Sequence, residues 1–296
     1  MEQRTLGRSD LNITRIGIGA WAIGGGKWEF GWGAQDDQES IAAIRAGLER
    51  GMNWIDTAAV YGLGHSETVV GHAIKGLHAP PYVFSKCSLT WDESGKILHN
   101  LEAASIRREA EASLKRLGVG AIDLYQIHWP AWKGAAESAS PGSIEEAVGE
   151  LAKLQAEGKI RHIGLSNFDT RQMQRALDVA PVTSLQPQYS LLARGAESSV
   201  LPFAREHGIG GDRLLPHGFR SADRRHDAGA RSGIPRRRLA QTEPELSGAA
   251  ALPQPAPGRD PARRRQAPQC DARRGRHRVD PAKSRCDWSD CGRPQR

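Results

Sequence analysis

The sequence has few cysteines and no long apolar run, and each absence excludes a class of protein. Its four cysteines are too few and too scattered for a disulfide framework. Three of them, Cys270, Cys286 and Cys291, lack the paired spacing of a zinc site. No stretch of about 20 apolar residues occurs, so no segment is expected to span a membrane. The amino terminus lacks the basic start and apolar run of a signal peptide. We therefore expect a cytoplasmic protein without a bound metal.

Residues 211–296 differ sharply in composition from residues 1–210. The first part holds 21 Lys and Arg against 24 Asp and Glu, and the second holds 20 against 10, so a net charge near −3 is followed by one near +10. Lys283 is the single lysine of the second part, and Phe219 and Trp288 are its aromatic residues. Such a segment buries too little apolar surface to offset its chain entropy. We predict a folded body over 1–210 and a disordered Arg/Pro/Gly-rich tail over 211–296.

Apolar runs alternate with helical patterns six times in the first part. After a hairpin near Gly7-Arg8-Ser9-Asp10, strands are predicted at 16–19, 54–56, 82–86, 124–128, 160–166 and 184–189. Helices are predicted at about 36–50, 66–77 and 101–117 and after Ser143, and a sixth near Val200, while the fifth is given no range. Strands that alternate with helices in this way are typical of a parallel sheet with right-handed crossovers.

Two α/β folds have this pattern. A doubly wound sheet needs a Gly-x-Gly-x-x-Gly turn after its first strand, but tryptophan and alanine interrupt the glycines of GIGAWAIGGG. A (β/α)8 barrel of the TIM type instead places its chemistry at the carboxyl ends of its strands. We predict the barrel, with six of its eight units recognisable before the composition changes.

Four polar side chains lie at, or just beyond, the carboxyl ends of predicted strands. Asp56, Lys86 and His128 end three strands, and Tyr61 follows Asp56. Taken singly, Asp56 is compatible with a turn cap, Lys86 with a solvated strand end, and His128 with a core histidine. Together they suit carbonyl reduction, because a tyrosine can protonate a developing alkoxide when a buried lysine ammonium lowers its pKa. An aspartate would orient the lysine, and a histidine would donate a hydrogen bond to the substrate oxygen.

The motifs around these residues resemble those of the aldo-keto reductase family. NWIDTAAVYGLGHSETVVGHAI is similar to its signature, VFSKC to its lysine strand, DLYQIHWP to its histidine strand, and KIRHIGLSNF to its nicotinamide-amide segment. The resemblance runs from residue 5 to residue 210 and is greatest to bacterial members. It implies reduction of a small aldehyde or ketone to an alcohol with NADP(H), with Tyr61 as the acid. Lys86 and Asp56 would tune this acid, and His128 would orient the substrate.

The resemblance also implies a cofactor site and a substrate pocket. Ser166 and Asn167 would hold the cofactor's carboxamide, and Gln186 would lie beside the nicotinamide ring. Trp21 and Trp129 would line the pocket.

The family also has a seventh strand and loop resembling VIAYSP, where this chain has GDRLLPHGFRSADRRHD. One back-translation of that stretch, read from the second base of each codon, gives VIAYSPMASGLLTGAM. We therefore predict that residues 211–296 are translated out of frame after a base gained near Gly210-Gly211, and that the chain as written is inactive. An arginine-rich nucleic-acid arm is the alternative, but this segment lacks the interleaved aromatic residues that base stacking requires.

Two other functions are compatible with the sequence. One is a barrel that binds NADP without catalysing a reaction, and the other is a barrel fragment whose basic tail binds polyanions. No specific nucleic-acid partner is expected. The sequence leaves the physiological substrate and the oligomeric state open.

Overall fold

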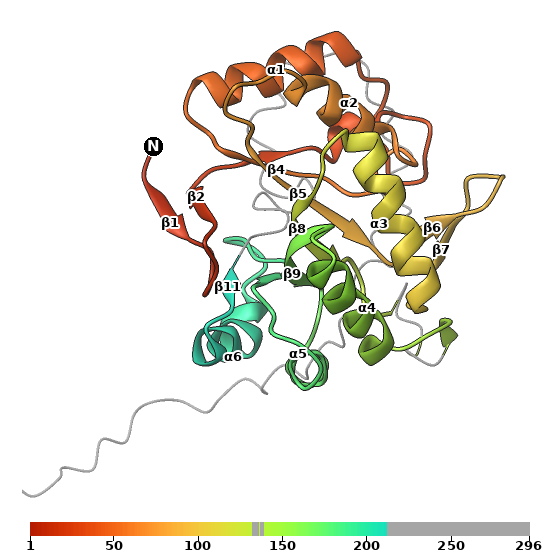
Figure 1. Ribbon diagram of the computed structural model, residues 1–296, viewed down its shortest axis with the longest axis vertical. Coiled ribbons are helices and arrows are strands. Elements are labelled where there is room, and N and C mark those ends of the chain that lie inside the picture. Colours follow the sequence, from red (N-terminus) through yellow and green to blue (C-terminus); the bar gives the residue numbers. More distant parts are fainter. Residues whose placement is uncertain (132–135, 137–138, 212–296) are drawn as a thin grey trace, which may run out of the picture. The chain divides into compact units, whose positions relative to one another are not determined.

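The computed structural model describes residues 1–131, 136 and 139–211, and these are drawn in colour in Figure 1. The predicted tail lies, from residue 212 onward, outside the described residues.

A seven-stranded parallel sheet forms the centre of the described part (Figure 1). In spatial order its strands are β3 (Ile18–Gly19), β4 (Trp54–Asp56), β5 (Tyr82–Cys87), β8 (Ile122–Ile127), β9 (Ile160–Ser166), β10 (Ser184–Gln186) and β11 (Gly210–Gly211). Each new strand of this sheet joins the same edge, and every neighbouring pair is parallel. A doubly wound sheet would reverse its strand order near the middle, so this order is that of a barrel. The predicted barrel-type fold is confirmed.

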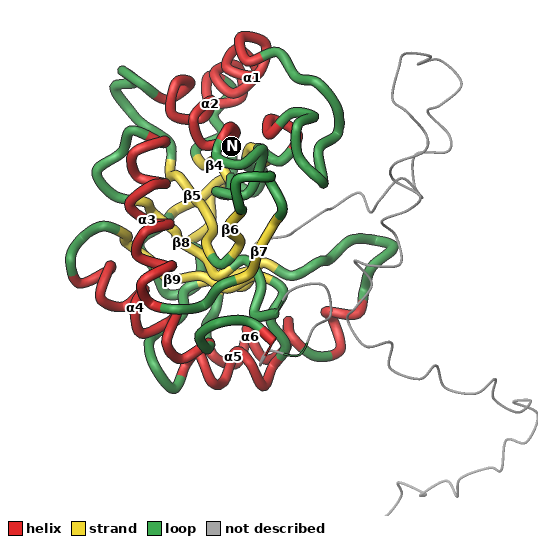
Figure 2. The backbone as a smooth tube through the Cα atoms, turned by 90° about the vertical axis from the view of Figure 1, so that its right-hand side faces the viewer, coloured by secondary structure: helices red, strands yellow, loops and turns green. Residues whose placement is uncertain are grey.

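The six α-helices of the described residues lie along the outer side of the curled sheet (Figure 2). They are α1 (Asp37–Glu49), α2 (His65–Ile74), α3 (Ala103–Leu117), α4 (Ile144–Ala156), α5 (Thr170–Leu177) and α6 (Val200–His207). Ser143 caps α4 as predicted, because its hydroxyl accepts a hydrogen bond from the Glu146 N–H. The sequence analysis gave no range for helix α5, although its apolar residues Met173, Ala176 and Leu177 have helical spacing. The capping box of Asp169 and Gln172 is the signal that could have found it.

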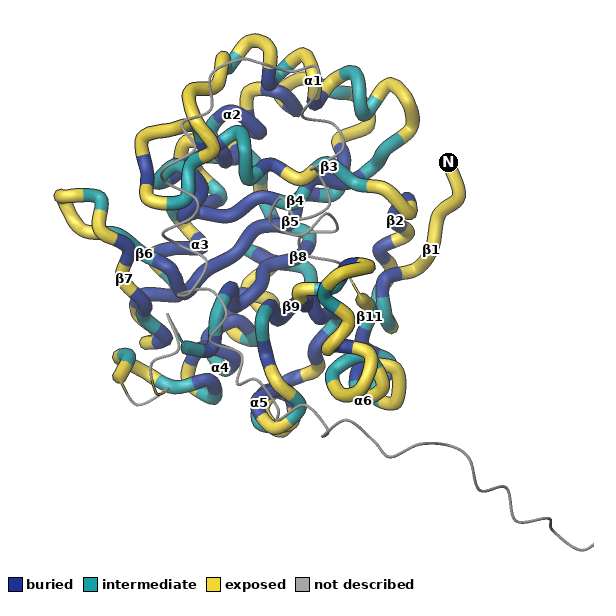
Figure 3. Tube along the Cα trace, turned by 180° about the vertical axis from the view of Figure 1, so that it is seen from behind, coloured by how far each residue is buried: buried dark blue, intermediate teal, exposed yellow. Residues whose placement is uncertain are grey.

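The apolar core fills the space between sheet and helices. Figure 3 shows β4, β5 and β8 as buried strands, while the outward sides of the helices are exposed. The fully buried residues include Ile55, Ile106, Tyr125, Leu151 and Leu165. This packing fixes the strands from outside, so their inward side chains and their ends are free to carry polar groups.

An amino-terminal hairpin covers the inner side of the sheet at the amino ends of its strands. Strands β1 (Gln3–Thr5) and β2 (Asn12–Thr14) pair antiparallel, as predicted. An apolar cluster joins hairpin side chains to inner-face residues of β4, β5 and β8, and its members are Leu6, Leu11, Ile13, Trp54, Phe84 and Leu124. The hairpin therefore closes one end of the sheet with apolar contacts and leaves the carboxyl end for chemistry.

A second hairpin, which was not predicted, lies between β5 and α3. Strands β6 (Leu89–Trp91) and β7 (Ile97–His99) pair antiparallel, and the Asp92 side chain closes the turn by accepting from the N–H groups of Ser94 and Lys96. Strands of three residues show too little alternation to be recognised in a sequence. This hairpin rises at the carboxyl end of β5, directly beside the predicted site.

Candidate active site

Lys86 lies at the centre of the polar residues at the carboxyl ends of the strands. Its side chain is fully buried, and its ammonium group donates to three oxygens. They are Asp56 Oδ2 at 2.6 Å, Thr57 O at 2.9 Å and Tyr61 OH at 3.4 Å. An ammonium group has three N–H donors and no acceptor, so each donor has an oxygen within reach. A buried charge is tolerated only with such partners.

Strand pairing and one tight turn bring these groups together. Asp56 lies opposite Phe84 in the β4–β5 pair, and Lys86 shares the inner face with Phe84 because side chains alternate along a strand. Tyr61 lies in the turn after β4, where its N–H donates to Ala58 O. Gly62 follows with a φ of 64°, and a Cβ on it would collide with Gly24 O. Only glycine fits there, so the turn depends on it.

His128 lies beside Tyr61 just after the end of β8. Its side chain is buried, and its ring meets that of Tyr61 edge to face with 5.7 Å between centroids. Burial holds the pKa of His128 well below 6.5, and the positive charge of Lys86 and the nearby His99 lower it further. The imidazole is therefore uncharged near neutral pH and keeps one N–H donor. Such a group can donate a hydrogen bond to a carbonyl oxygen.

Aromatic side chains of the loop between β3 and α1 gather beside Tyr61. The Trp21 ring stacks on Tyr61 at 5.8 Å between centroids, and the Trp28 ring lies at 5.9 Å. Phe30 packs on Trp28, and Trp32 lies 6.1 Å from Trp21. Of these four residues, Trp21 was predicted to line the pocket and the other three were not. The stretch GKWEFGW, with its aromatic residues between glycines, is the signal that could have found them.

Trp129 belongs to the same aromatic group, and the unpredicted hairpin holds its backbone. It packs, partly buried, against the cluster that contains Tyr61. His99 Nε2 donates to Trp129 O at 2.8 Å, and Ser88 Oγ donates to that oxygen at 3.2 Å and accepts from the Trp129 N–H at 3.3 Å. Ser88 has a φ of 80°, and its N–H donates to Glu109 Oε2. No sequence pattern predicts these hydrogen bonds, because the residues that form them come from four separate segments.

The residues predicted to bind a cofactor form one connected group at the ends of β9 and β10. Ser166 Oγ donates to Gln186 O at 3.0 Å, and Asn167 Nδ2 donates to Ser166 Oγ and to His128 O, both at 3.0 Å. Asn167 has a φ of 61°, a conformation that asparagine adopts more readily than most residues. With its amide donors so placed, Asn167 Oδ1 is the atom left to accept from a ligand.

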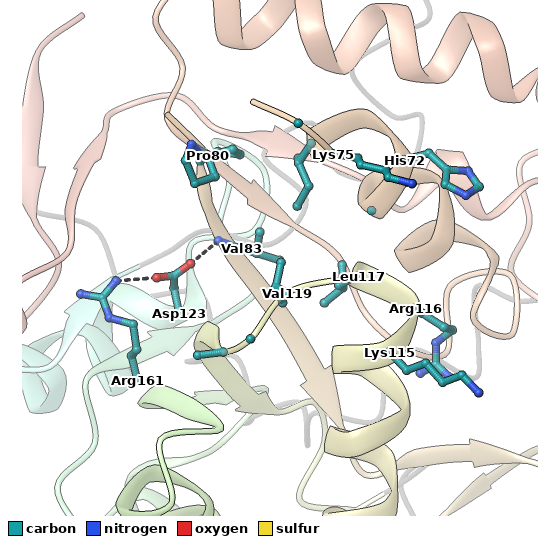
Figure 4. A pocket seen from close by; sticks show the side chains of 17 residues that line it. His72, Lys75, Pro80, Val83, Lys115, Arg116, Leu117, Val119, Asp123 and Arg161 are labelled. Carbon is teal, nitrogen blue, oxygen red and sulfur yellow. Dashed lines mark hydrogen bonds and ion pairs between the residues drawn. The ribbon is translucent and has the colours of Figure 1, made fainter. Parts of the chain in front are cut away.

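A hollow at the opposite end of the strands is not part of this site. It is lined by residues at the carboxyl ends of α2 and α3 and at the amino ends of β5 and β8, several of them basic (Figure 4). Arg116 is held by Glu67, and Arg161 by Asp123, which also accepts from the Val83 N–H. Basic side chains at helix carboxyl ends offset the partial negative charge there. We assign these residues a stabilising role.

The described residues contain neither a candidate metal site nor a membrane-spanning helix. No group of three or more His, Cys, Asp and Glu side chains in residues 1–131, 136 and 139–211 could hold a metal ion. In the same part of the chain, no helix is long and apolar enough to cross a membrane.

A parallel sheet wound in one direction, with helices outside it and polar side chains at the carboxyl ends of its strands, defines a (β/α) barrel protein. The model of the aldo/keto reductase family matches residues 15–257 of this chain. The chain belongs to that family.

Its relatives include bacterial enzymes. It is 41% identical to the aldo-keto reductase YhdN of Bacillus subtilis (strain 168) over 211 residues, which are 71% of this chain and 60% of that protein. It is 38% identical to the NADH-specific methylglyoxal reductase of Escherichia coli (strain K12) over 222 residues, 71% of this chain and 65% of that one. The solved glycerol dehydrogenase AKR11B4 from Gluconobacter oxydans matches with a TM-score of 0.67 and 36% identity, over 83% of this chain and 72% of that one. The chain thus spans less than two thirds of the length of the two curated relatives.

Proposed function

We propose that the protein is a nicotinamide-dependent oxidoreductase that reduces an aldehyde or ketone to an alcohol. The observation that carries this proposal is the Lys86 ammonium group, which contacts both Asp56 Oδ2 and Tyr61 OH. A phenol beside a fixed positive charge suits an acid that must give its proton to a developing alkoxide.

Each of the four residues has one task in this proposal. Tyr61 gives its proton to the substrate oxygen, and the Lys86 ammonium stabilises the phenolate that remains. Asp56 keeps the ammonium group in place. His128, uncharged at neutral pH, donates a hydrogen bond to the same substrate oxygen and orients it. Trp21 and Trp129 give the pocket apolar walls.

The donor set at β9 and β10 fits a nicotinamide carboxamide. Asn167 Oδ1 can accept from the amide N–H2, and Ser166 and Gln186 lie next to it. When bound, the cofactor supplies the hydride that the carbonyl carbon receives. The resemblance implies NADP(H), and we propose this cofactor. Because one relative is named an NADH-specific enzyme, both cofactors belong in the test.

Replacing Tyr61 by phenylalanine tests the proposed acid. We expect oxidation of NADPH with a panel of aldehydes to fall by at least about 100-fold, the usual contribution of a positioned acid. The assay uses a form whose reading frame is restored near Gly210. Tyr82→Phe is the control, since Tyr82 begins β5 and so lies at the end of that strand opposite Lys86. Equal rates with and without the Tyr61 hydroxyl would contradict the assignment. Tight NADPH binding without turnover would favour the non-catalytic subunit instead.

We further propose that residues 1–210 are the reductase body and that residues 211–296 come from a shifted frame. A barrel closes when its last strands pair with its first, so the chain as written is expected to bind NADPH far more weakly than the restored form and to turn over little. Fluorescence titration of the full chain with NADPH measures this. Micromolar binding by the chain as written, together with a tail after Gly210 that resists limited proteolysis, would refute the shifted frame.

A further inference from the structure

Gln126 is a buried polar residue on the inner face of the sheet, in the same layer as Lys86. Pairing places Lys86 opposite Gln126, Gln126 opposite Gly164, and Gly164 opposite Ser184. Residues at paired positions share a face, so one layer of side chains crosses β5, β8, β9 and β10. Gln126 is 0% exposed, and a buried side-chain amide is expected to have hydrogen-bond partners.

Gly164 allows Gln126 to lie flat against the neighbouring strand. A Cβ at Gly164 would lie 2.7 Å from Gln126 Cγ and 2.7 Å from Ser184 Oγ, too close for any real atom. The side chains of Gln126 and Ser184 therefore occupy the space that a larger residue would fill. Gln126 is thus confined from one side.

The amide of Gln126 is turned toward the active site. Its Nε2 donates to Asp56 Oδ1 at 3.3 Å, while Asp56 Oδ2 accepts from Lys86. Gln126 Oε1 is buried without a hydrogen-bond partner among the described residues. Turning the amide over would place this oxygen against a carboxylate, which is repulsive. A buried oxygen without a partner costs free energy. The amide keeps this orientation nevertheless, so the hydrogen bond to Asp56 outweighs that cost.

We propose that Gln126 is a positioning residue of the active site, which holds Asp56 Oδ1 so that Oδ2 stays directed at Lys86. A carboxylate can rotate about its bond to Cβ, and donors on both oxygens prevent this rotation. Gln126 acts through Asp56 and Lys86 on Tyr61 and does not itself touch the substrate. The effect of Gln126 on catalysis rests on the proposed function. The hydrogen bond from Gln126 to Asp56 can be tested without any turnover.

The test is the ¹⁵N–¹H resonance of the Lys86 ammonium group in the full-length chain. A buried and hydrogen-bonded ammonium group exchanges slowly enough to be observed. Gln126→Met keeps the size and removes the donor, and we expect the Lys86 resonance to shift or to broaden beyond detection. Tyr125→Phe is the matched control, because it removes a buried oxygen from the other face of the same strand. It is expected to leave the Lys86 resonance in place.

An unchanged Lys86 resonance in Gln126→Met, or an equal change in both variants, would overturn the proposal. The unmodified chain gives an independent measurement if Gln126→Met does not fold. One Nε2 proton of Gln126 should exchange at least about tenfold more slowly than those of the exposed Gln38, and equal exchange would overturn the proposal.

In the restored form, Gln126→Met is expected to lower kcat about tenfold with KM nearly unchanged. A restored form without turnover would refute the proposed function and leave the resonance result as it stands. A kcat equal to that of the parent would overturn the positioning role.

Discussion

Asp56→Asn is expected to destabilise the protein by about 3–5 kcal/mol, because it leaves the Lys86 ammonium group buried without a counter-charge. The side chain of Lys86 is fully buried and that of Asp56 is 14% exposed, so water can replace little of what the carboxylate provides. Urea unfolding of the full-length chain measures the change.

Two further variants distinguish the cost of an unpaired buried charge from the cost of losing an ordinary ion pair. Asp56→Asn combined with Lys86→Met removes both charges and is expected to recover much of the stability. Glu111→Gln breaks the half-exposed pair with Lys159, 2.7 Å apart, and is expected to change the stability little because water screens this pair. If Asp56→Asn lowers the unfolding free energy as little as Glu111→Gln does, the stabilising role of the buried Asp56–Lys86 pair is contradicted.

Glu109→Gln is expected to stabilise the protein above pH 6 and to flatten the dependence of its stability on pH. Burial raises the pKa of Glu109 from 4.5 to about 8. In the unfolded chain this carboxyl group is ionised above about pH 4.5, whereas the folded protein keeps it protonated up to about pH 8. The unfolding free energy therefore falls as the pH rises from about 4.5 to about 8, and stays level beyond. At about 1.4 kcal/mol per pKa unit, the loss reaches at most about 5 kcal/mol.

The surroundings of Glu109 allow glutamine to replace it with little strain. Its Oε2 accepts from the Ser88 N–H and its Oε1 from Ser105 Oγ, and a glutamine oxygen and N–H2 can take both positions. The titratable groups that face it are Cys87, Tyr125, Arg108 and Arg116.

Urea unfolding from pH 4.5 to pH 9 measures the difference between the parent and the variant. His128 contributes the opposite slope below pH 6.5 in both proteins and so cancels from this difference. The exposed Glu206→Gln is the control, and parallel curves for Glu109→Gln and the parent would contradict the assignment.

The sequence predicted those elements whose signal is contained in a short segment. The strand 160–166 matches β9 to the residue, and the helices after Asp36 and Ser143 begin at the caps that mark them. Strand β10 ends at Gln186, three residues before its predicted end, and β11 pairs with it at Gly210-Gly211, where the recognisable units were expected to stop. Strand ends depend on which neighbour completes the hydrogen bonds, and a single segment does not contain that information.

The candidate site divides along the same line. The sequence alone predicts that four polar residues lie at strand ends: Asp56, Tyr61, Lys86 and His128. It also contains the glycine next to Tyr61 that the turn requires. The family can be recognised from the sequence as well, because its motifs are continuous stretches of sequence. Only the tertiary structure decided that the Lys86 ammonium group has three oxygen partners, that Gln126 turns its amide to Asp56, and that burial keeps His128 uncharged and raises the pKa of Glu109. The physical reason is that hydrogen bonding and desolvation depend on atoms brought together from distant segments, whereas helical and strand periodicity depend on near neighbours along the chain.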